Sequence, residues 1–300
     1  MPESTVITRY DELSFSLAEV PTMPLPKEAL MVTPEYFTID YVINPHMEGH
    51  VGSVDRDAAR QEWEQVRDAF VQAGIKIHAI QGQAGLPDMV FCANQSLPYI
   101  SENGSKHVLM SRMHADQRKD EVGFIQQWYQ ANAYTVHHIE SDTVRDFEGM
   151  GDAIWHSGKR LIWGGYGFRS SLDAYTQVSA LFDVPVVALE LRHPSFYHLD
   201  TCFCMLNSKT ALIYPHAFTD EGLDLIRAVI PVIVEADQYE AEALFACNAT
   251  CPDGQHVIIQ QGCTKVNRQL YELGFTVLEV STDEYRKSGG SVFCMKMMVF

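Results

Sequence analysis

One order of segments recurs five times along the 300 residues of this chain, and it restricts the folds that the chain can adopt. Each unit runs from an apolar strand through a polar turn and an amphipathic helix to a β-branched strand, and then to a motif of small, acidic and aromatic residues. The β-branched strands are expected to begin at residues 75, 134, 184, 231 and 275. This regular spacing favours one closed α/β array over two independent domains.

The first unit illustrates the pattern and the alternative to it. Residues 41–47 (YVINPHM) are expected to form its first strand, and the helix that follows carries Trp63, Val66 and Phe70 on one face. An open doubly wound α/β sheet would alternate helices and strands in a similar way. Against that alternative, no Gly-x-Gly-x-x-Gly stands between the first strand and its helix.

The proline-rich first residues stand outside the repeat. We expect residues 1–35 to form an N-terminal leader and residues 36–300 to form a single domain. The N-terminus lacks the basic and apolar regions of a signal peptide, and the chain contains no run of 18 apolar residues. A soluble, cytoplasmic protein is therefore expected.

Composition argues against several classes of ligand. The chain has 22 Lys and Arg against 39 Asp and Glu, a formal charge of −17, which disfavours binding to nucleic acid or to an anionic membrane. Its seven cysteines have irregular spacing, and Cys202-x-Cys204 and Cys247-x3-Cys251 lack the partners of a structural zinc site. We expect neither a metal nor a cofactor, because a thiolate and an imidazole suffice for the chemistry considered below.

Residues that are costly to bury gather in the motif segments, which a closed array would bring to one central funnel. They are Asp88, Asn94, Glu148, Asp152, His198, Asp200 and Cys294. A cysteine nucleophile needs a base, and a carboxylate can orient that base. In this interpretation Cys294 is the nucleophile, His198 its base and Glu148 the orienting group. Asp88 and Asp200 are then left to bind a cation.

Each of these residues also has a structural explanation. Taken alone, Cys294 is an ordinary buried thiol and His198 a hydrogen-bonded core histidine. Asp88 follows a proline and Asp152 a glycine, so both also suit turns in which they accept backbone hydrogen bonds. The conjunction of acidic motifs, His-x-Asp and Gly-Gly-Ser-x-x-Cys at equivalent positions of the repeat favours the catalytic interpretation.

Four motifs resemble, in the same order, those of the guanidino-group-modifying, or pentein, superfamily. They are PDMVFCAN (87–94), FEGMGDA (147–153), HLD (198–200) and GGSVFC (289–294). The superfamily includes arginine deiminases, dimethylarginine dimethylaminohydrolases, amidinotransferases and arginine dihydrolases. The resemblance covers about residues 36–300 and implies a five-bladed, pseudo-symmetric α/β propeller.

The resemblance also implies a role for each candidate residue. Cys294 would attack the guanidinium carbon, His198 would transfer protons, and Glu148 would orient His198. Asp200 and the PDMVFCAN motif, with Asp88 and Asn94, would grip the guanidinium. The other substrate-binding candidates are Arg112 and Arg169, which match positions that hold the substrate α-carboxylate, together with Asn44 and Asp152.

The sequence of the chain supports a substrate-binding role for Arg112 and Arg169 only in part. Each follows a predicted strand at the mouth of the funnel, where a guanidinium fork suits a carboxylate. Either arginine also fits a surface position, paired with this acidic chain.

Asn94 stands where deiminases and dimethylaminohydrolases of the superfamily carry an acidic residue. A carboxylate there favours a cationic guanidinium, whereas an amide can also donate to the carbonyl of a retained citrulline. This difference predicts an arginine dihydrolase, which converts arginine to ornithine, two ammonia molecules and carbon dioxide. The alternatives are a dimethylarginine dimethylaminohydrolase or an arginine deiminase giving citrulline, an amidinotransferase, and a non-catalytic arginine-binding module. A homo-oligomer is allowed but not required.

Overall fold

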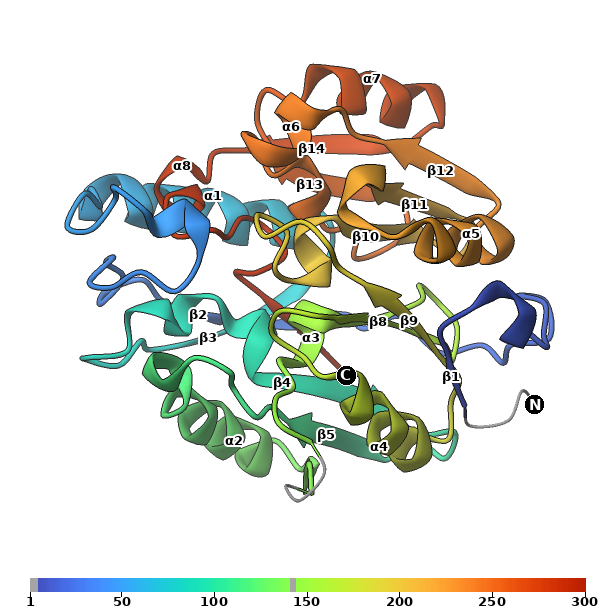
Figure 1. Ribbon diagram of the computed structural model, residues 1–300. Coiled ribbons are helices and arrows are strands. Elements are labelled where there is room, and N and C mark those ends of the chain that lie inside the picture. Colours follow the sequence, from blue (N-terminus) through green and yellow to red (C-terminus); the bar gives the residue numbers. More distant parts are fainter. Residues whose placement is uncertain (1–4, 141–143) are drawn as a thin grey trace.

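The computed structural model describes residues 5–140 and 144–300, whose strands form five separate small sheets (Figure 1). Each sheet contains a parallel pair of strands. The pairs are β2 (Glu28–Val32) with β3 (Lys76–Ile80), β5 (Lys106–Met110) with β6 (Thr135–His138), β8 (Ile162–Tyr166) with β9 (Val186–Glu190), β11 (Thr210–Ile213) with β12 (Val232–Glu235), and β13 (His256–Gln260) with β14 (Thr276–Val280).

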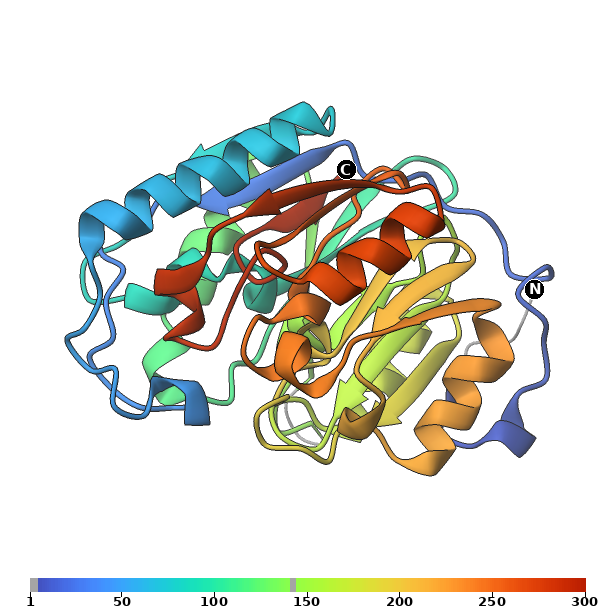
Figure 2. The same cartoon turned by 90° about the horizontal axis from the view of Figure 1, so that it is seen from above.

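In four sheets a further strand pairs antiparallel with the first member of the pair. These strands are β15 (Met297–Val299), β4 (Ser96–Ile100), β7 (Ala153–Trp155) and β10 (Phe203–Asn207). The short β1 (Val6–Ile7) adds to β9 in parallel. Because β15 pairs with β2, the C-terminal strand lies beside the N-terminal part of the chain (Figure 2).

A helix connects the two strands of each parallel pair. In chain order the helices are α1 (Arg56–Gln72), α2 (Glu121–Ala131), α4 (Leu172–Phe182), α5 (Asp220–Val229) and α7 (Thr264–Glu272). The strands after these helices begin at residues 76, 135, 186, 232 and 276, within two residues of the predicted starts. The predicted alternation of helices and β-branched strands is confirmed.

Local sequence explains the limits of α1. The side chain of Asp55 caps its N-terminus by accepting hydrogen bonds from two backbone amides of the first turn. Trp63, Val66 and Phe70 are buried on the predicted face. Gly74 ends the helix with a φ of +79°, in the left-handed region that favours glycine.

The predicted strand over residues 41–47 is wrong. That stretch contains the 3₁₀ helix η2 (Pro45–Met47), where Pro45 has no N–H for a strand ladder and the Asn44 side chain caps the turn. The strand that precedes α1 is β2, which is almost fully buried. Both β1 and β2 come from the segment expected to be a leader, so part of that segment belongs to the sheets. Its residues 1–4 lie outside the described residues.

The motif segments form short helices that contact one another. They are η3 (Pro87–Val90), η4 (Cys92–Gln95), α3 (Gly149–Asp152), η6 (Leu199–Thr201) and η8 (Ala246–Asn248). Helix α3, which lies near the middle of Figure 1, contacts η4 and η6, and η6 contacts η8. Residues far apart in the sequence are thus brought together.

The remaining short helices lie outside these motif segments. They are η1 (Tyr10–Glu12), η5 (Asp116–Arg118), η7 (Pro215–Ala217), α6 (Gln238–Glu242) and α8 (Asp283–Arg286). Among the described residues, no helix is both long enough and apolar enough to cross a membrane.

Candidate active site

A cavity of about 290 Å³ lies where the motif segments meet. Its walls come from the loop before α1, from η3 and η4, from η5, and from the loops that carry His198 and Cys294. The lining residues are Ile43, Asn44, Met47, Asp88, Phe91, Asn94, Arg118, Arg169, Tyr197, His198, Ser288, Gly289, Gly290 and Cys294. Six of the ten residues predicted for the site therefore line one cavity.

Cys294 lies in this wall with its thiol held between two polar side chains. The thiol donates to Asp200 Oδ2 at 3.1 Å, and Asn248 Nδ2 donates to Sγ at 3.2 Å. Burial and the adjacent Asp200 carboxylate raise the pKa of the thiol well above its usual range. A thiol with a raised pKa stays neutral near pH 7, so a cation beside Cys294 would be needed to favour the thiolate.

Gly290 allows close packing in the loop that carries Cys294. A Cβ atom at this position would lie 2.4 Å from the Phe91 ring and 3.2 Å from Cys294 Cβ. Asn248 Oδ1 accepts the backbone N–H groups of Ser291 and Cys294, which fixes the turn that follows. The Gly-Gly-Ser-x-x-Cys motif thus combines a glycine at a tight contact with a turn that presents the thiol.

We expect Gly290→Ala to lower the free energy of unfolding by about 1–3 kcal/mol, because the added methyl group overlaps an aromatic ring. Gly123→Ala is the matched control. Gly123 lies within α2 with open space around its Cβ position, so alanine should stabilise the helix by up to about 1 kcal/mol. Urea unfolding should give a lower free energy of unfolding for Gly290→Ala and a higher one for Gly123→Ala than for the unsubstituted protein. Equal stabilities of the two variants would contradict the packing argument.

Glu148 lies behind His198 and does not itself line the cavity. His198 Nε2 and Glu148 Oε2 are 2.5 Å apart, and both side chains are buried. Glu148 Oε1 accepts from the backbone of His114 at 2.9 Å and lies 3.5 Å from Arg169 Nη1. Burial alone would raise the pKa of Glu148, but its contacts with His198 and with nearby arginines lower it to about 2. Glu148 is therefore an anion that can hold the imidazole in one orientation.

Replacing Glu148 with glutamine should lower turnover of the substrate by about 10²- to 10⁴-fold, since an amide neither stabilises a protonated His198 nor fixes its tautomer. Glu190→Gln, at a partly exposed carboxylate near Arg192, should leave turnover unchanged. Steady-state kinetics of the two variants test this. Equal rates for Glu148→Gln and the unsubstituted protein would be the contrary result.

The same variant should also alter acid unfolding. The pKa of Glu148 falls from an ordinary 4.5 to about 2 on folding, so its ionisation stabilises the native state above pH 4.5. That contribution is lost as the pH falls from 4.5 toward 2. The stability difference between the unsubstituted protein and Glu148→Gln should therefore shrink over this range, as denaturant titrations at several pH values would measure.

Arg118 was not predicted, yet it organises one wall of the cavity. Its guanidinium donates to Asn94 Oδ1 at 2.9 Å, to Glu121 at 2.9 Å and to the backbone carbonyls of Asp88 and Phe91. Because Asn94 Oδ1 is engaged by Arg118, the orientation of the amide is fixed. Among the described residues Asn94 Nδ2 has no hydrogen-bond partner, and it packs against Gly151, where an added Cβ atom would lie 2.1 Å from it.

Asp88 contributes a buried carboxylate to the same cavity. It accepts from the Tyr41 hydroxyl at 2.8 Å and from the Ser288 hydroxyl at 3.2 Å. Burial raises the pKa of Asp88, against the opposing charge of Arg118. Asn44, also predicted, donates from its side chain to the backbone carbonyl of Ser288 at 3.0 Å.

The two predicted arginines have different positions. Arg169 lines the cavity, donates to the carbonyl of Ile43 at 2.7 Å and lies over the Tyr197 ring at 4.9 Å. Arg112 does not line the cavity. Its backbone forms an isolated bridge with Phe147, which holds the chain next to Glu148.

Asp152 is also outside the cavity, contrary to its predicted contact with the substrate. Its carboxylate accepts from Ser170 Oγ at 2.7 Å and from the backbone N–H of Leu199 at 3.0 Å. It therefore fixes the turn that follows His198. Burial raises the pKa of Asp152 to about 6.

Taken together, buried acids outnumber buried cations around the cavity. Asp88, Glu121, Glu148 and Asp200 face Arg118 and Arg169, and burial raises the pKa values of Glu121 and Asp200 to about 7. Such a site favours a cationic ligand. Over residues 5–140 and 144–300, no group of three or more His, Cys, Asp or Glu side chains is arranged to hold a metal ion.

Comparisons with known proteins agree with this chemistry. The profile of a family described as N,N dimethylarginine dimethylhydrolase, eukaryotic, matches residues 33–300. The bifunctional arginine dihydrolase/ornithine cyclodeaminase ArgZ of Synechocystis sp. is 36% identical over 276 residues, which cover 90% of this chain and 37% of ArgZ. The N(G),N(G)-dimethylarginine dimethylaminohydrolase of Mycobacterium tuberculosis is 31% identical over 282 residues, 92% of this chain and 87% of that protein.

A solved structure shares the fold. The N-terminal domain of ArgZ, an arginine dihydrolase bound to its product, has a TM-score of 0.83 and 33% identity, and it covers 90% of this chain and 96% of that domain. The chain spans 37% of the length of the bifunctional relatives, AgrE and ArgZ, that it matches.

Proposed function

The chain belongs to the N,N dimethylarginine dimethylhydrolase family, and on this premise we propose that it hydrolyses the guanidino group of arginine through a covalent intermediate on Cys294. One observation carries the proposal. Cys294 and His198 line the same cavity, and the carboxylate of Glu148 holds the imidazole of His198. A thiol, a base and an orienting carboxylate are the groups that nucleophilic catalysis requires.

Binding of the guanidinium would activate the thiol. The cation would lie among the acids of the cavity, with Asp88 in the wall and Asp200 behind Cys294. A positive charge beside Sγ favours the thiolate and offsets the effect of Asp200 on the thiol pKa. Arg169, which is buried at the wall, would hold the α-carboxylate of the substrate.

Two steps would convert arginine to citrulline. The thiolate forms a bond to the guanidinium carbon, and His198 protonates the nitrogen that departs as ammonia. His198 then takes a proton from water, which attacks the amidino carbon. The C–S bond breaks, and the thiolate of Cys294 is restored.

We propose that the reaction continues to ornithine, which makes the protein an arginine dihydrolase. The free donor of Asn94 supports this, because Nδ2 can hold the ureido carbonyl of citrulline in place. A second attack by Cys294 releases the second ammonia, and water hydrolyses the resulting thiocarbamate. The carbamate formed loses carbon dioxide and leaves ornithine.

A second candidate is a dimethylarginine dimethylaminohydrolase, which the family description and the Mycobacterium tuberculosis relative favour. It would use the same three residues and release dimethylamine and citrulline. An amidinotransferase would replace water by an amine in the second step. A pure binding module would need the acidic cavity but neither Cys294 nor His198.

The finer structural predictions are part of the same proposal. We infer that the five sheets are the blades of a pseudo-symmetric α/β propeller around the cavity and act as one catalytic domain, which extends beyond the predicted residues 36–300 to include β2. A cytoplasmic location and a homo-oligomeric assembly stay predictions.

The purified protein incubated with arginine tests the proposed reaction directly. Mass spectrometry of the products, with an ammonia assay, should find two ammonia molecules for each ornithine. One ammonia for each citrulline would identify a deiminase. Turnover of dimethylarginine in place of arginine would favour the second candidate, and no turnover of either compound would contradict hydrolysis.

A further inference from the structure

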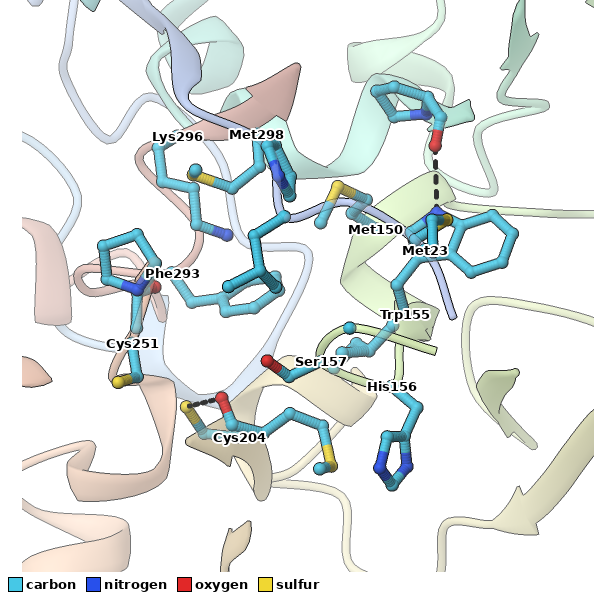
Figure 3. A pocket seen from close by; sticks show the side chains of 18 of the residues that line it. Met23, Met150, Trp155, His156, Ser157, Cys204, Cys251, Phe293, Lys296 and Met298 are labelled. Atoms are coloured by element: carbon cyan, nitrogen blue, oxygen red, sulfur yellow. Dashed lines mark hydrogen bonds between the residues drawn. The ribbon is translucent and has the colours of Figure 1, made fainter. Parts of the chain in front are cut away.

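A second, larger cavity of about 680 Å³ lies beside the same motif segments but shares none of the described residues that line the first (Figure 3). Its walls are mainly apolar, with Met23, Met150, Phe293 and Met298 among the side chains that enclose it. The proposed reaction makes no use of this space.

Lys296 places a charge in this apolar cavity. Its side chain is fully buried, and Figure 3 shows its ammonium group directed into the space between the lining side chains. Nζ lies 3.1 Å from the centre of the Phe293 ring and has no hydrogen-bond partner among the described residues. A buried ammonium without an anionic partner is costly, so its position calls for a ligand.

The charge on Lys296 persists near neutral pH. Burial lowers the pKa of the ammonium to about 8, and the negative charge of Asp200 opposes that shift. Most of the protein at pH 7 therefore carries a cation in this cavity.

Thr250 adds a second unsatisfied group to the same wall. Its buried hydroxyl also has no hydrogen-bond partner within the described part of the chain. Two other polar lining groups are engaged, since Trp155 donates to the carbonyl of Pro98 at 2.9 Å and His156 Nε2 contacts the carbonyl of Ser208 at 3.0 Å. An ammonium and a hydroxyl thus remain to bind an acceptor.

We propose that this cavity is a binding site for a small apolar monocarboxylate, with its carboxylate on Lys296 and Thr250 and its apolar body against the methionine and phenylalanine side chains. A carboxylate complements one ammonium and one hydroxyl donor. A phosphate ester would bring a second negative charge into walls that offer it no second cation. A neutral apolar compound would leave the ammonium unpaired.

Several residues that line this cavity are close neighbours of Cys294 or of its contacts in the chain. Phe293 and Lys296 flank Cys294, and Thr250 follows Asn248, whose amide donates to Cys294 Sγ. Met150 belongs to α3, directly after Glu148 and Gly149. A carboxylate bound here would therefore lie next to the segments that carry Cys294 and Glu148 without entering the first cavity.

Isothermal titration of octanoate into the full chain, with 1-octanol as the neutral probe, tests the site. We expect octanoate to bind the unsubstituted protein and Lys296→Met to weaken that binding about tenfold or more, because methionine keeps the volume and removes the charge. The affinity for 1-octanol should not decrease in Lys296→Met. Absence of octanoate binding, or equal octanoate affinity in the variant, would overturn the proposal.

Two further measurements keep the test decisive. Thr250→Val removes the hydroxyl at nearly constant volume and should weaken octanoate binding several-fold, which covers the case in which Lys296→Met does not fold. Octanoate should also bind Cys294→Ala and should not be displaced by saturating arginine. Complete displacement would place the carboxylate in the first cavity and contradict the inference. Because binding is measured without turnover, failure of the proposed reaction would leave this test intact.

Discussion

Replacement of Cys294 by alanine is expected to lower arginine turnover by about 10⁴-fold or more, because no covalent intermediate can then form. Binding of arginine should persist, since the acids that surround the cavity and the Arg118 network are unchanged. Stopped assays of ammonia release measure the first effect, and calorimetry with arginine measures the second. Loss of turnover with retained binding would show that Cys294 is needed for the reaction and not for holding the substrate.

Cys247→Ala is the matched control for this experiment. Cys247 is also fully buried, and burial likewise raises the pKa of its thiol well above the usual range. It does not line the cavity, so its removal should alter stability more than turnover. Comparable losses of activity in both variants would mean that buried thiols in general, and not the position of Cys294, support the activity.

The environment of Cys294 bears on its proposed activation. Asp200 accepts the thiol proton in a hydrogen bond and disfavours the thiolate. A bound guanidinium reverses the local charge, and Asn248 remains as a donor to the sulfur anion. Activation would therefore depend on the substrate, and before the substrate binds the neutral thiol would react little with other electrophiles.

The period of the repeat was visible in the sequence, but the first strand was not. Each β-branched strand follows an amphipathic helix. The helical spacing of apolar residues, such as Trp63 and Phe70 in α1, therefore supports the prediction of the strand after the helix. β2 follows a proline-rich stretch and no amphipathic helix lies directly before it among the described residues, so its apolar residues fit a leader as well as a strand. Residues 41–47 contain enough apolar side chains to resemble a strand, although Pro45 prevents one.

For the site, motifs located the residues but could not assign every contact. Cys294 and His198 reach the same cavity because their segments occupy equivalent positions in the repeat. Arg118 gave no such signal, since the sequence around it (DQRKD) is that of an exposed turn. Its burial depends on Glu121 and Asn94, which only tertiary packing brings to it. Asn248 lies in the motif segment of the fourth repeat unit (ALFACNAT, residues 243–250), and its amide could have been considered as a partner for the thiol.

The position of Asp152 shows the limit of motif-based assignment. An acidic residue in such a motif can bind a ligand or fix a turn, and both explanations fit the same sequence. Here the Asp152 carboxylate accepts from Ser170 and Leu199 and is already satisfied. Asn94, by contrast, retains an unused donor. Unsatisfied hydrogen-bonding groups in residues that line a cavity, which a sequence does not reveal, are candidates for contact with a ligand.

Asn94→Asp is expected to change the main product from ornithine to citrulline, with the ratio of ornithine to citrulline falling about tenfold or more. The new carboxylate would still accept from Arg118 Nη1, so the wall of the cavity should keep its shape. It would have no donor for the ureido carbonyl, and citrulline would leave after the first hydrolysis. Mass spectrometry of products at matched conversion of arginine measures the ratio.

The comparison variant is Asn132→Asp, which makes the same chemical change at an exposed amide beyond α2 and should leave the product ratio unaltered. If Asn94→Asp still releases mainly ornithine, the amide at this position does not retain citrulline, and another group must hold the intermediate. If citrulline accumulates while the rate of the first ammonia release is preserved, the second hydrolysis depends on one hydrogen-bond donor. That result would place the difference between the two reactions at Nδ2 of Asn94, an atom with no other partner among the described residues.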